Sequence, residues 1–192
     1  IEEAEETPET PYQGFDDVAE DAWYAEAVRY VCEAGLLEGE SEALFAPGKS
    51  IDRYMLATGL HRVLGEPDSD GALPEDAQSG QWYSDAVAWA VEAGVLLCGD
   101  DNDFHGEDAA LREEIGYALY VCAQLAEAEV TAETDEIFAD AADISDWAAE
   151  AMSWCAAAGL FQGDGNGYLN PTATATRAEA AALMMRYLEN IS

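Results

Sequence analysis

The sequence predicts an all-α protein made of three helix-loop-helix repeats that pack together as one body. A Trp-to-Gly spacing of 12 residues, followed by a Gly-to-Arg spacing of 18, occurs three times along the chain. Apolar residues recur every three to four positions on both sides of each of these glycines, which is the period of a helix. No pair of alternating segments joined by a hairpin turn predicts strand pairing. Units of about 50 residues are marginal alone, so we expect the repeats to share a core.

The spacing also sets the expected boundaries of the repeats. The three triplets are Trp23, Gly35 and Arg53; Trp82, Gly94 and Arg112; and Trp147, Gly159 and Arg177. They define repeats over residues 15–65, 73–125 and 138–190, offset by 59 and then 65 residues. Residues 1–14 are acidic and contain proline, which is typical of a disordered leader or linker.

Repeat one shows the helical pattern of each unit. Its first helix carries apolar residues every four positions and should end near Gly35, where a left-handed conformation can stop a helix. We expect Trp23, and with it Trp82 and Trp147, to lie in the core, since large aromatic side chains bury well, with exposed platforms for stacking a ligand as the alternative. Asp52 is the expected N-cap of the second helix. The apolar stripe of that helix consists of Leu56, Leu60, Val63 and Leu64.

Repeats two and three differ at the start of their second helices. In repeat two the apolar stripe is Ile115, Ala118, Leu119 and Cys122. Leu111 occupies its cap position and offers no side-chain acceptor, a loss that typically costs about 1 kcal/mol. In repeat three, Thr176 and Glu179 form a capping box, in which each side chain bonds the other residue's backbone N–H. Arg177 lies between them at the positive end of the helix dipole, where a cation is disfavoured, so we expect it to have another role.

The charge of the chain excludes several partners. Forty-one acidic residues face seven basic ones, for a formal net charge of −34. Nucleic acids and anionic membrane surfaces require positive patches, so neither is expected as a partner. No run of 18 apolar residues exists, so membrane insertion is not expected either. The chain begins at Ile1 without a methionine or a signal-like segment, which predicts a processed or excised portion of a longer protein. We expect this portion to be monomeric.

No catalytic or metal site stands out, and we expect neither an enzyme nor a cofactor. The four cysteines follow no zinc-ligand spacing and are interpreted as small buried residues, with a Cys98–Cys122 bridge as an alternative. The segment GDGNGYLNPTAT suggests a calcium loop, but Tyr168 and Ala175 stand where an EF-hand needs ligands, so a turn is expected instead. His61 and His105 are isolated, and carboxylate pairs arise by chance among 41 acids.

The aligned repeats share a motif. It reads F-x-D, then W-[YA]-x-[ED]-A, then A-G-[LV]-[LF], then a glycine and a loop with Phe or Tyr near Pro, then [ST]-R-x-E. GDGNGYLNP and TRAE are nearly complete in repeat three. From residue 15 to residue 188 the chain resembles the S-layer homology domain family. That resemblance implies a pseudo-threefold trimer formed by a single chain, and an extracellular location at the cell wall of a Gram-positive-type bacterium.

The resemblance also implies a function and a set of site residues. The family anchors surface proteins non-covalently to secondary cell-wall polysaccharide, often through a pyruvylated sugar bound in grooves between repeats. The candidates carried over by position are Arg53, Arg112, Arg177, Glu114, Glu179, Gly39, Gly99 and Gly163. Repeat one has Met55 in place of the glutamate, and its helix begins IDRYM. Repeat two begins LREE, so the groove that contains Arg177, in the complete TRAE motif, is the one expected to bind.

A second interpretation comes from another class of function. The degraded motifs of repeats one and two are also compatible with a structural or protein-interaction module that has lost most of its glycan sites. The surroundings of the three arginines distinguish the two. Arginines that face open grooves favour binding, because a guanidinium can meet a carboxylate with two hydrogen bonds. Arginines buried against their own acidic neighbours favour a scaffold.

Overall fold

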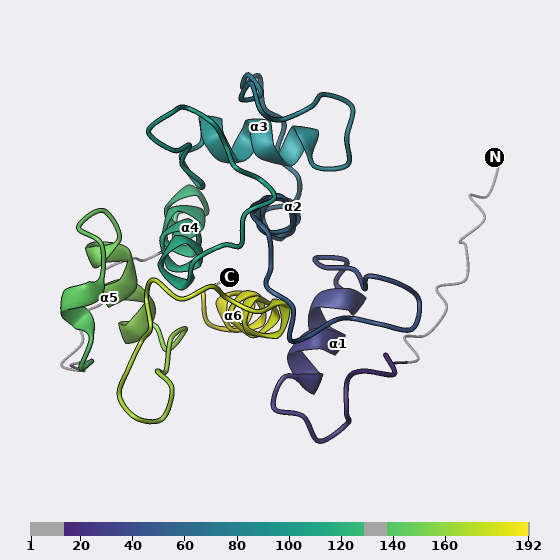
Figure 1. Ribbon diagram of the computed structural model, residues 1–192, viewed down its shortest axis with the longest axis vertical. Coiled ribbons are helices and arrows are strands. Elements are labelled where there is room, and N and C mark those ends of the chain that lie inside the picture. The colour runs from purple at the N-terminus through teal and green to yellow at the C-terminus, as the bar shows by residue number, and fades with distance from the viewer. Residues whose placement is uncertain (1–13, 129–137, 192) are drawn as a thin grey trace.

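The computed structural model describes residues 14–128 and 138–191, and these form a helical body. The expected leader lies almost wholly outside this range, as do residues 129–137 between repeats two and three. Each repeat contributes two α-helices, and a short 3-10 helix, Ala141–Asp143, opens repeat three (Figure 1). The α-helices are α1 (Ala25–Glu33), α2 (Arg53–Val63), α3 (Ser84–Glu92), α4 (Arg112–Leu125), α5 (Ala149–Ala157) and α6 (Arg177–Asn190).

The helices form two shells around a pseudo-threefold axis. The second helices of the repeats, α2, α4 and α6, lie at the centre, and α1, α3 and α5 surround them (Figure 1). Each outer helix packs on the inner helix of another repeat, because α3 contacts α2, α5 contacts α4 and α1 contacts α6. The three repeats therefore exchange helices in a closed cycle, and the shared core predicted from their size is confirmed.

Apolar side chains on the predicted stripes fill this core. Leu56, Leu60, Ile115, Leu119 and Cys122 are fully buried. The helix boundaries follow the predicted signals, since Asp52 caps α2 by accepting the Met55 backbone N–H at 2.7 Å. The capping box of α6 is confirmed, and Leu111 gives α4 no side-chain cap.

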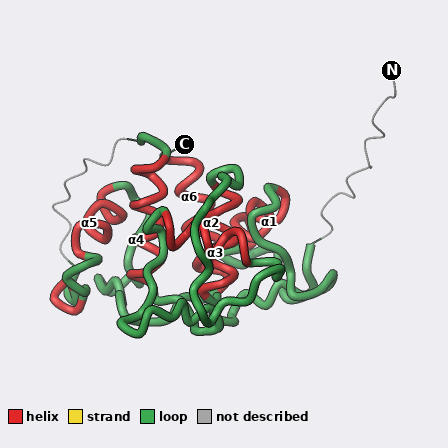
Figure 2. Tube along the Cα trace, turned by 90° about the horizontal axis from the view of Figure 1, so that it is seen from above, coloured by secondary structure: helices red, strands yellow, loops and turns green. Residues whose placement is uncertain are grey.

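A ring of three backbone hydrogen bonds closes the axis where the inner helices begin. The Ile51 N–H donates to the Ala175 carbonyl at 3.0 Å, the Ala175 N–H to the Ala110 carbonyl at 2.9 Å, and the Ala110 N–H to the Ile51 carbonyl at 2.9 Å. Isolated antiparallel bridges flank this ring, and the described residues contain no longer strand. Figure 2 shows the loops gathered along one edge of the body, with the helices beside them.

The prediction that the repeated tryptophans are core residues is wrong. Trp23, Trp82 and Trp147 are exposed by 65%, 61% and 45%. The outer helices begin two residues after each tryptophan, so the helical face of the later apolar residues does not extend back to them. Trp23 and Trp82 pack edge-on against the following tyrosines, with ring centroids 5.3 Å apart.

The cysteines are free thiols, so the alternative Cys98–Cys122 bridge is not formed. Cys122 and Cys155 are buried as expected, whereas Cys32 and Cys98 are partly exposed. Burial raises the pKa of Cys32 to about 11. Among the described residues, no helix is long and apolar enough to cross a membrane.

Candidate ligand-binding grooves

The three repeated arginines are the first residues of the inner helices, and each reaches into the next repeat. Arg53 contacts repeat two, Arg112 contacts repeat three and Arg177 contacts repeat one. Their Nε atoms donate to the carbonyls of Phe104, Leu169 and Phe45 at 2.9, 2.8 and 2.8 Å. Each guanidinium also lies over a phenylalanine ring of that repeat, at 4.9 Å from Phe104, 5.2 Å from Phe161 and 4.5 Å from Phe45. These contacts fix the arginine side chains.

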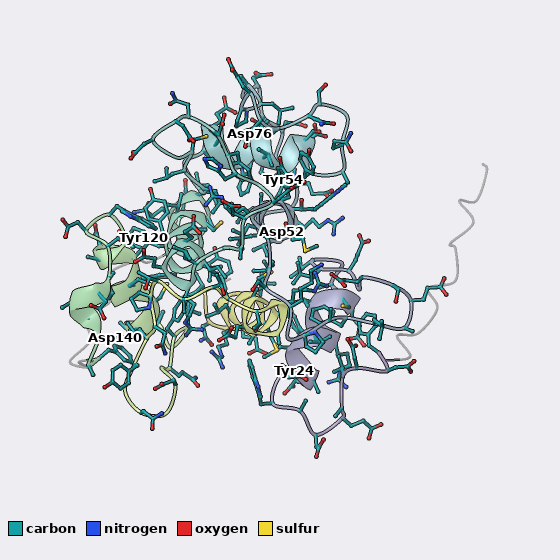
Figure 3. All side chains as sticks on the ribbon, in the orientation of Figure 1. Tyr24, Asp52, Tyr54, Asp76, Tyr120 and Asp140 are labelled. Atoms are coloured by element: carbon teal, nitrogen blue, oxygen red, sulfur yellow. The ribbon has the colours of Figure 1, made fainter. Side chains whose placement is uncertain are left out.

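An aspartate at the start of each repeat holds the loop whose carbonyl accepts the arginine Nε–H. Asp17 accepts the backbone N–H groups of Phe45 and Ala46 at 2.9 and 2.7 Å. Asp76 and Asp140, which Figure 3 places in the outer part of the molecule, do the same for their own repeats. The residue that donates the second of these N–H groups has a positive φ in every repeat, with values of 59° for Ala46, 54° for His105 and 52° for Asn170. This aspartate, which repeat two keeps although Pro74 replaces the phenylalanine of F-x-D, therefore stabilises a left-handed turn that presents the carbonyl.

Two of the arginines are paired with a glutamate of the repeat that they reach. The Glu179 Oε1 accepts from Arg112 at 2.7 Å, while its Oε2 accepts the Thr176 backbone N–H at 2.8 Å. Glu114 makes the same two contacts, with Arg53 and with the Leu111 N–H at 2.8 Å. Each carboxylate thus joins a guanidinium to the start of its own helix.

Arg177 differs from the other two arginines. Its Nη1 meets the Met55 sulfur at 3.1 Å, and its Nη2 donates to the Glu38 carbonyl at 2.6 Å. Within the described residues it makes no ion pair. Arg177 is 2% exposed and Arg53 7% exposed, and burial lowers the pKa of both guanidinium groups. Arg177 is therefore a buried cation without a bonded carboxylate.

Each arginine lies in a groove that draws on all three repeats. The Arg177 groove contains Gly39 of repeat one and Trp82 of repeat two. The Arg53 groove contains Gly99, Glu114 and Trp147. The Arg112 groove contains Gly163, Glu179 and Trp23. Every site residue predicted from the sequence thus lines one of the three grooves.

The loop glycines are needed for close packing. A Cβ on Gly39 would lie 2.5 Å from the Phe15 ring, and one on Gly163 would lie 3.2 Å from the Phe138 ring. Gly163 also has a φ of 72°, a left-handed conformation that favours glycine. The F-x-D phenylalanines therefore pack where a larger loop residue would stand.

The exposed tryptophans are the groove residues that were expected in the core, and their positions fit the alternative of exposed stacking platforms. In each groove, the tryptophan comes from the repeat that supplies neither the arginine nor the glycine loop. The position of a tryptophan within its own repeat could not show which groove it lines, because the grooves form only when the exchange of helices brings the three repeats together. The available signal was an aromatic residue of fixed type in a polar segment just before each outer helix.

Two loops carry acidic side chains of the kind that bind metal ions. In repeat three, the Asp164 Oδ1 accepts the Asn166 and Tyr168 backbone N–H groups at 2.8 and 3.2 Å, so this aspartate closes a turn. In repeat two, Asp101, Asp103 and His105 lie close enough together to hold a metal ion. The described part of the chain contains no other such group. Their loop is largely exposed, and no further feature indicates a bound metal.

Comparison with known proteins agrees with this architecture. The profile of the S-layer homology domain matches residues 14–53, 75–115 and 137–181, more than half of the chain. An amylopullulanase of Thermoanaerobacterium thermosulfurigenes is 30% identical over 181 residues, which are 91% of this chain and 9% of that protein. The S-layer protein sap of Bacillus anthracis is 30% identical over 90% of this chain and 21% of its own length.

A third relative is the surface-layer 125 kDa protein of Lysinibacillus sphaericus, which is 31% identical over 86% of this chain and 14% of its own length. The chain thus spans a small part of each of these relatives. Surface-layer proteins and an amylopullulanase therefore share this segment. The repeats, the fold and the profile matches together show that the chain belongs to the S-layer homology domain family.

Proposed function

We propose that this chain anchors a longer protein by binding an anionic cell-wall polysaccharide in the grooves between its repeats, with a pyruvylated sugar as the expected anionic group. S-layer homology domains are non-catalytic cell-wall anchoring modules that bind cell-wall polysaccharide, which places the chain at the cell surface. The observation that carries the proposal is the pairing, in every groove, of a fixed arginine with an exposed tryptophan from another repeat.

The two side chains suit different parts of such a ligand. An exposed indole offers a flat apolar face against which the C–H face of a sugar can pack. A guanidinium can hold a carboxylate with two charge-assisted hydrogen bonds. The arginine is positioned in advance by a carbonyl and a phenylalanine ring, so it loses little side-chain entropy on binding.

The net charge of −34 does not prevent this binding. Repulsion between exposed charges is screened beyond a Debye length of about 8 Å at physiological salt, whereas a bonded guanidinium acts at contact distance. We therefore expect affinity to hold or improve from low to physiological salt. A steep loss of affinity over that range would contradict this account.

The alternative, a structural or protein-interaction module, is favoured by one observation. Arg53 and Arg112 are already paired with Glu114 and Glu179, so two of the three arginines meet carboxylates of the protein itself. A module with these two grooves closed to anions would depend on the Arg177 groove for glycan binding. Sacculus binding that is unchanged by every one of the three single tryptophan replacements would favour the alternative.

The test is a pull-down of the chain on purified cell-wall sacculi from its own source, with and without removal of the non-peptidoglycan polymer. Trp23, Trp82 and Trp147 are replaced singly by alanine. Because these side chains are exposed, the variants should remain folded. We expect polymer-dependent binding that is weakened most by Trp82→Ala, since its groove contains Arg177.

The matched control is Leu125→Ala, which removes an apolar side chain that is 48% exposed and lines none of the three grooves. It should bind as the unmodified chain does. Folded wild-type chain that fails to bind sacculi, or binds equally after the polymer is removed, would overturn the proposal. Analytical ultracentrifugation in the same buffer tests the accompanying expectation that the chain is monomeric.

A further inference from the structure

The junction between repeats one and two contains a cavity that none of the three repeated arginines lines. This linker cavity has a volume of about 630 Å³ and lies between the second half of α2, the linker after it and the start of α3. Its volume is within the range of about 300–1,000 Å³ that is usual for ligand sites. His61 of α2, Asp85 of α3 and Trp82 are among the residues that line it.

The equivalent junction between repeats two and three is closed by a hydrogen bond. Tyr120 holds the α4 position that corresponds to His61, and its hydroxyl donates to Glu150 of α5 at 2.9 Å. Figure 3 shows Tyr120 on the side of α4 toward α5. Glu150 corresponds in turn to Asp85. Both rings also pack against a tryptophan of the outer helix, with centroids 5.6 Å apart for Tyr120 and 5.1 Å apart for His61.

In the first junction, the corresponding pair leaves a buried acceptor beside a free one. The His61 Nε2–H donates to the Pro67 carbonyl at 3.0 Å, so Nδ1 carries the lone pair of the neutral ring. Among the described residues, neither this Nδ1 nor the Asp85 carboxylate has a hydrogen-bond partner. His61 is 8% exposed, and no fully buried side-chain nitrogen of the described residues lacks a partner, so its Nδ1 is reached from the cavity. A donor for this atom must therefore come from a bound molecule.

The other walls of the cavity favour a ligand that is rich in hydrogen-bond donors. Glu66 adds a further carboxylate. Arg62 is paired with Glu38 at 3.1 Å and lies 4.0 Å from Glu66, so its charge is already met by the protein. Two neighbouring hydroxyl groups of a sugar ring can donate to the imidazole and to Asp85, one to each. Trp82 offers an apolar face for the C–H side of the same ring.

The linker cavity is continuous with the Arg177 groove. Thr58, Arg62 and Trp82 line both of them. Trp82 is 61% exposed, so ligand atoms can contact its indole from either side. A glycan bound in the groove can therefore extend along α2, past Trp82 and into the cavity.

We propose that the linker cavity binds a neutral sugar unit of the glycan through two neighbouring hydroxyl groups, which donate to the His61 Nδ1 and to the Asp85 carboxylate. This unit adjoins the part of the glycan in the Arg177 groove, so the chain recognises a stretch of polymer in addition to its anionic sugar. In the junction of repeats two and three, the bond between Tyr120 and Glu150 takes the place of the ligand. The inference rests on the proposed function and adds a site outside the three grooves.

The chain contains two histidines, which gives the test an internal reference. The probes are the methyl glycosides of glucose, mannose and galactose, which present neighbouring hydroxyl groups in different orientations. NMR follows the ring nitrogens at mildly alkaline pH, where an ordinary imidazole is neutral. We expect at least one glycoside to move the Nδ1 signal of His61 and to leave the signals of the exposed His105 in place. Two control compounds should move neither histidine: 2-(hydroxymethyl)tetrahydropyran, a ring with a single hydroxyl, and methylammonium, a small cationic donor.

Asp85→Ala removes one of the two acceptors and should weaken glycoside binding about three- to tenfold, as expected for the loss of one hydrogen bond. Glu26→Ala is the matched control, because Glu26 holds the same exposed position in the first turn of α1 and does not line the cavity. It should bind as the unmodified chain does. In the sacculus pull-down, Asp85→Ala should lower retention by a similar factor and Glu26→Ala should not.

The decisive variant combines His61→Tyr with Asp85→Glu and so rebuilds the pair of the other junction. The new side chains should bond each other, fill the cavity and abolish glycoside binding while the fold stays intact. Because this variant lacks the His61 signal, binding is followed through the backbone N–H of Gly80, which lines the cavity. Circular dichroism and thermal unfolding check that the variant is folded.

Five outcomes would overturn the inference. They are a His61 signal that no glycoside moves, equal shifts of the two histidines, an equal shift by either control compound, undiminished binding by Asp85→Ala, and undiminished binding by the folded double variant. The sacculus pull-down separates this inference from the proposed function. Polymer-dependent retention with an unmoved His61 signal rejects the sugar site alone, whereas a folded chain that is not retained rejects the function.

Discussion

The axis and the grooves have kept the threefold symmetry to different degrees. At the axis, three equivalent backbone hydrogen bonds have lengths of 3.0, 2.9 and 2.9 Å although they join an isoleucine and two alanines. In the grooves, the position that faces the arginine is glutamate twice and methionine once. Contacts made by backbone groups tolerate changes of side chain, whereas each groove changes its chemistry with a single substitution. The architecture can therefore stay constant while individual binding sites diverge.

The largest effect on stability should come from disrupting the ring of backbone hydrogen bonds at the axis. Ala110→Pro removes the N–H that bonds the Ile51 carbonyl and leaves that buried carbonyl unsatisfied, so we expect a loss of about 3 kcal/mol or more in the free energy of unfolding. Ala109→Pro is the matched control, because the Ala109 N–H donates to no described residue. Denaturant unfolding measures both. Equal losses would show that the ring contributes nothing specific.

A second prediction concerns Gly106, where the three repeats differ because the ring of Tyr54 fills the space next to the backbone. Gly106 stands where the other repeats have Pro47 and Pro171, and an added Cβ would collide with the Tyr54 ring, which is stacked on Tyr83 at a centroid distance of 3.7 Å. Gly106→Ala should destabilise the fold by about 1–3 kcal/mol, as overpacking does.

Gly48→Ala is the control for that substitution. Gly48 has open space around its Cβ position and no positive φ, so alanine should be neutral or stabilising by up to about 1 kcal/mol. Thermal unfolding compares the two. If Tyr54 is the cause, Tyr54→Ala should remove most of the additional cost of Gly106→Ala; independent, additive effects would contradict this assignment.

The helix starts offer a smaller comparison. Thr176 caps α6 by accepting the Glu179 N–H at 3.2 Å, whereas Leu111 cannot do so for α4. Thr176→Ala should therefore cost about 1 kcal/mol, and Leu111→Thr should gain a similar amount. Urea unfolding of the two single variants tests the pair. A stabilising Thr176→Ala or a destabilising Leu111→Thr would contradict the capping argument.

The smallest effect should be a pH dependence confined to the loop of repeat two. A hydrogen bond to Asp101 raises the pKa of His105 above its ordinary value, and the same bond lowers the pKa of Asp101. Because the folded-state pKa of the histidine exceeds the unfolded one, its stabilisation is present below the unfolded pKa. It is lost as pH rises through the folded pKa.

NMR titration of the His105 ring measures this shift directly. Asp101→Asn should return the midpoint toward the ordinary histidine value. Asn170, the counterpart of His105 in repeat three, cannot titrate, so the corresponding loop should show no such pH dependence. An unchanged His105 midpoint in the variant would assign the shift to other charges.

Much of this molecule follows from local patterns, and what does not follow depends on packing between repeats. The inner helices, their caps and the three arginines were predicted because periodicity and capping residues act within one segment. The exposed tryptophans were predicted wrongly, because a four-residue spacing does not show where a helix begins. The packing of α1 on α6 and the meeting of Met55 with Arg177 join residues more than a hundred positions apart, and no local signal carries that information.

The closed ring at the axis also bears on how such chains can change in length. Its three N–H groups and three carbonyls are used up among three partners, so a fourth repeat would find no free position and a pair of repeats would leave one donor and one acceptor exposed. Duplication or deletion of a single repeat therefore disrupts closure, whereas whole triplets can be copied or lost. Since every repeat holds an equivalent place in the ring, joining the end of repeat three to the start of repeat one and opening the chain between two repeats should give a circular permutant with the same fold.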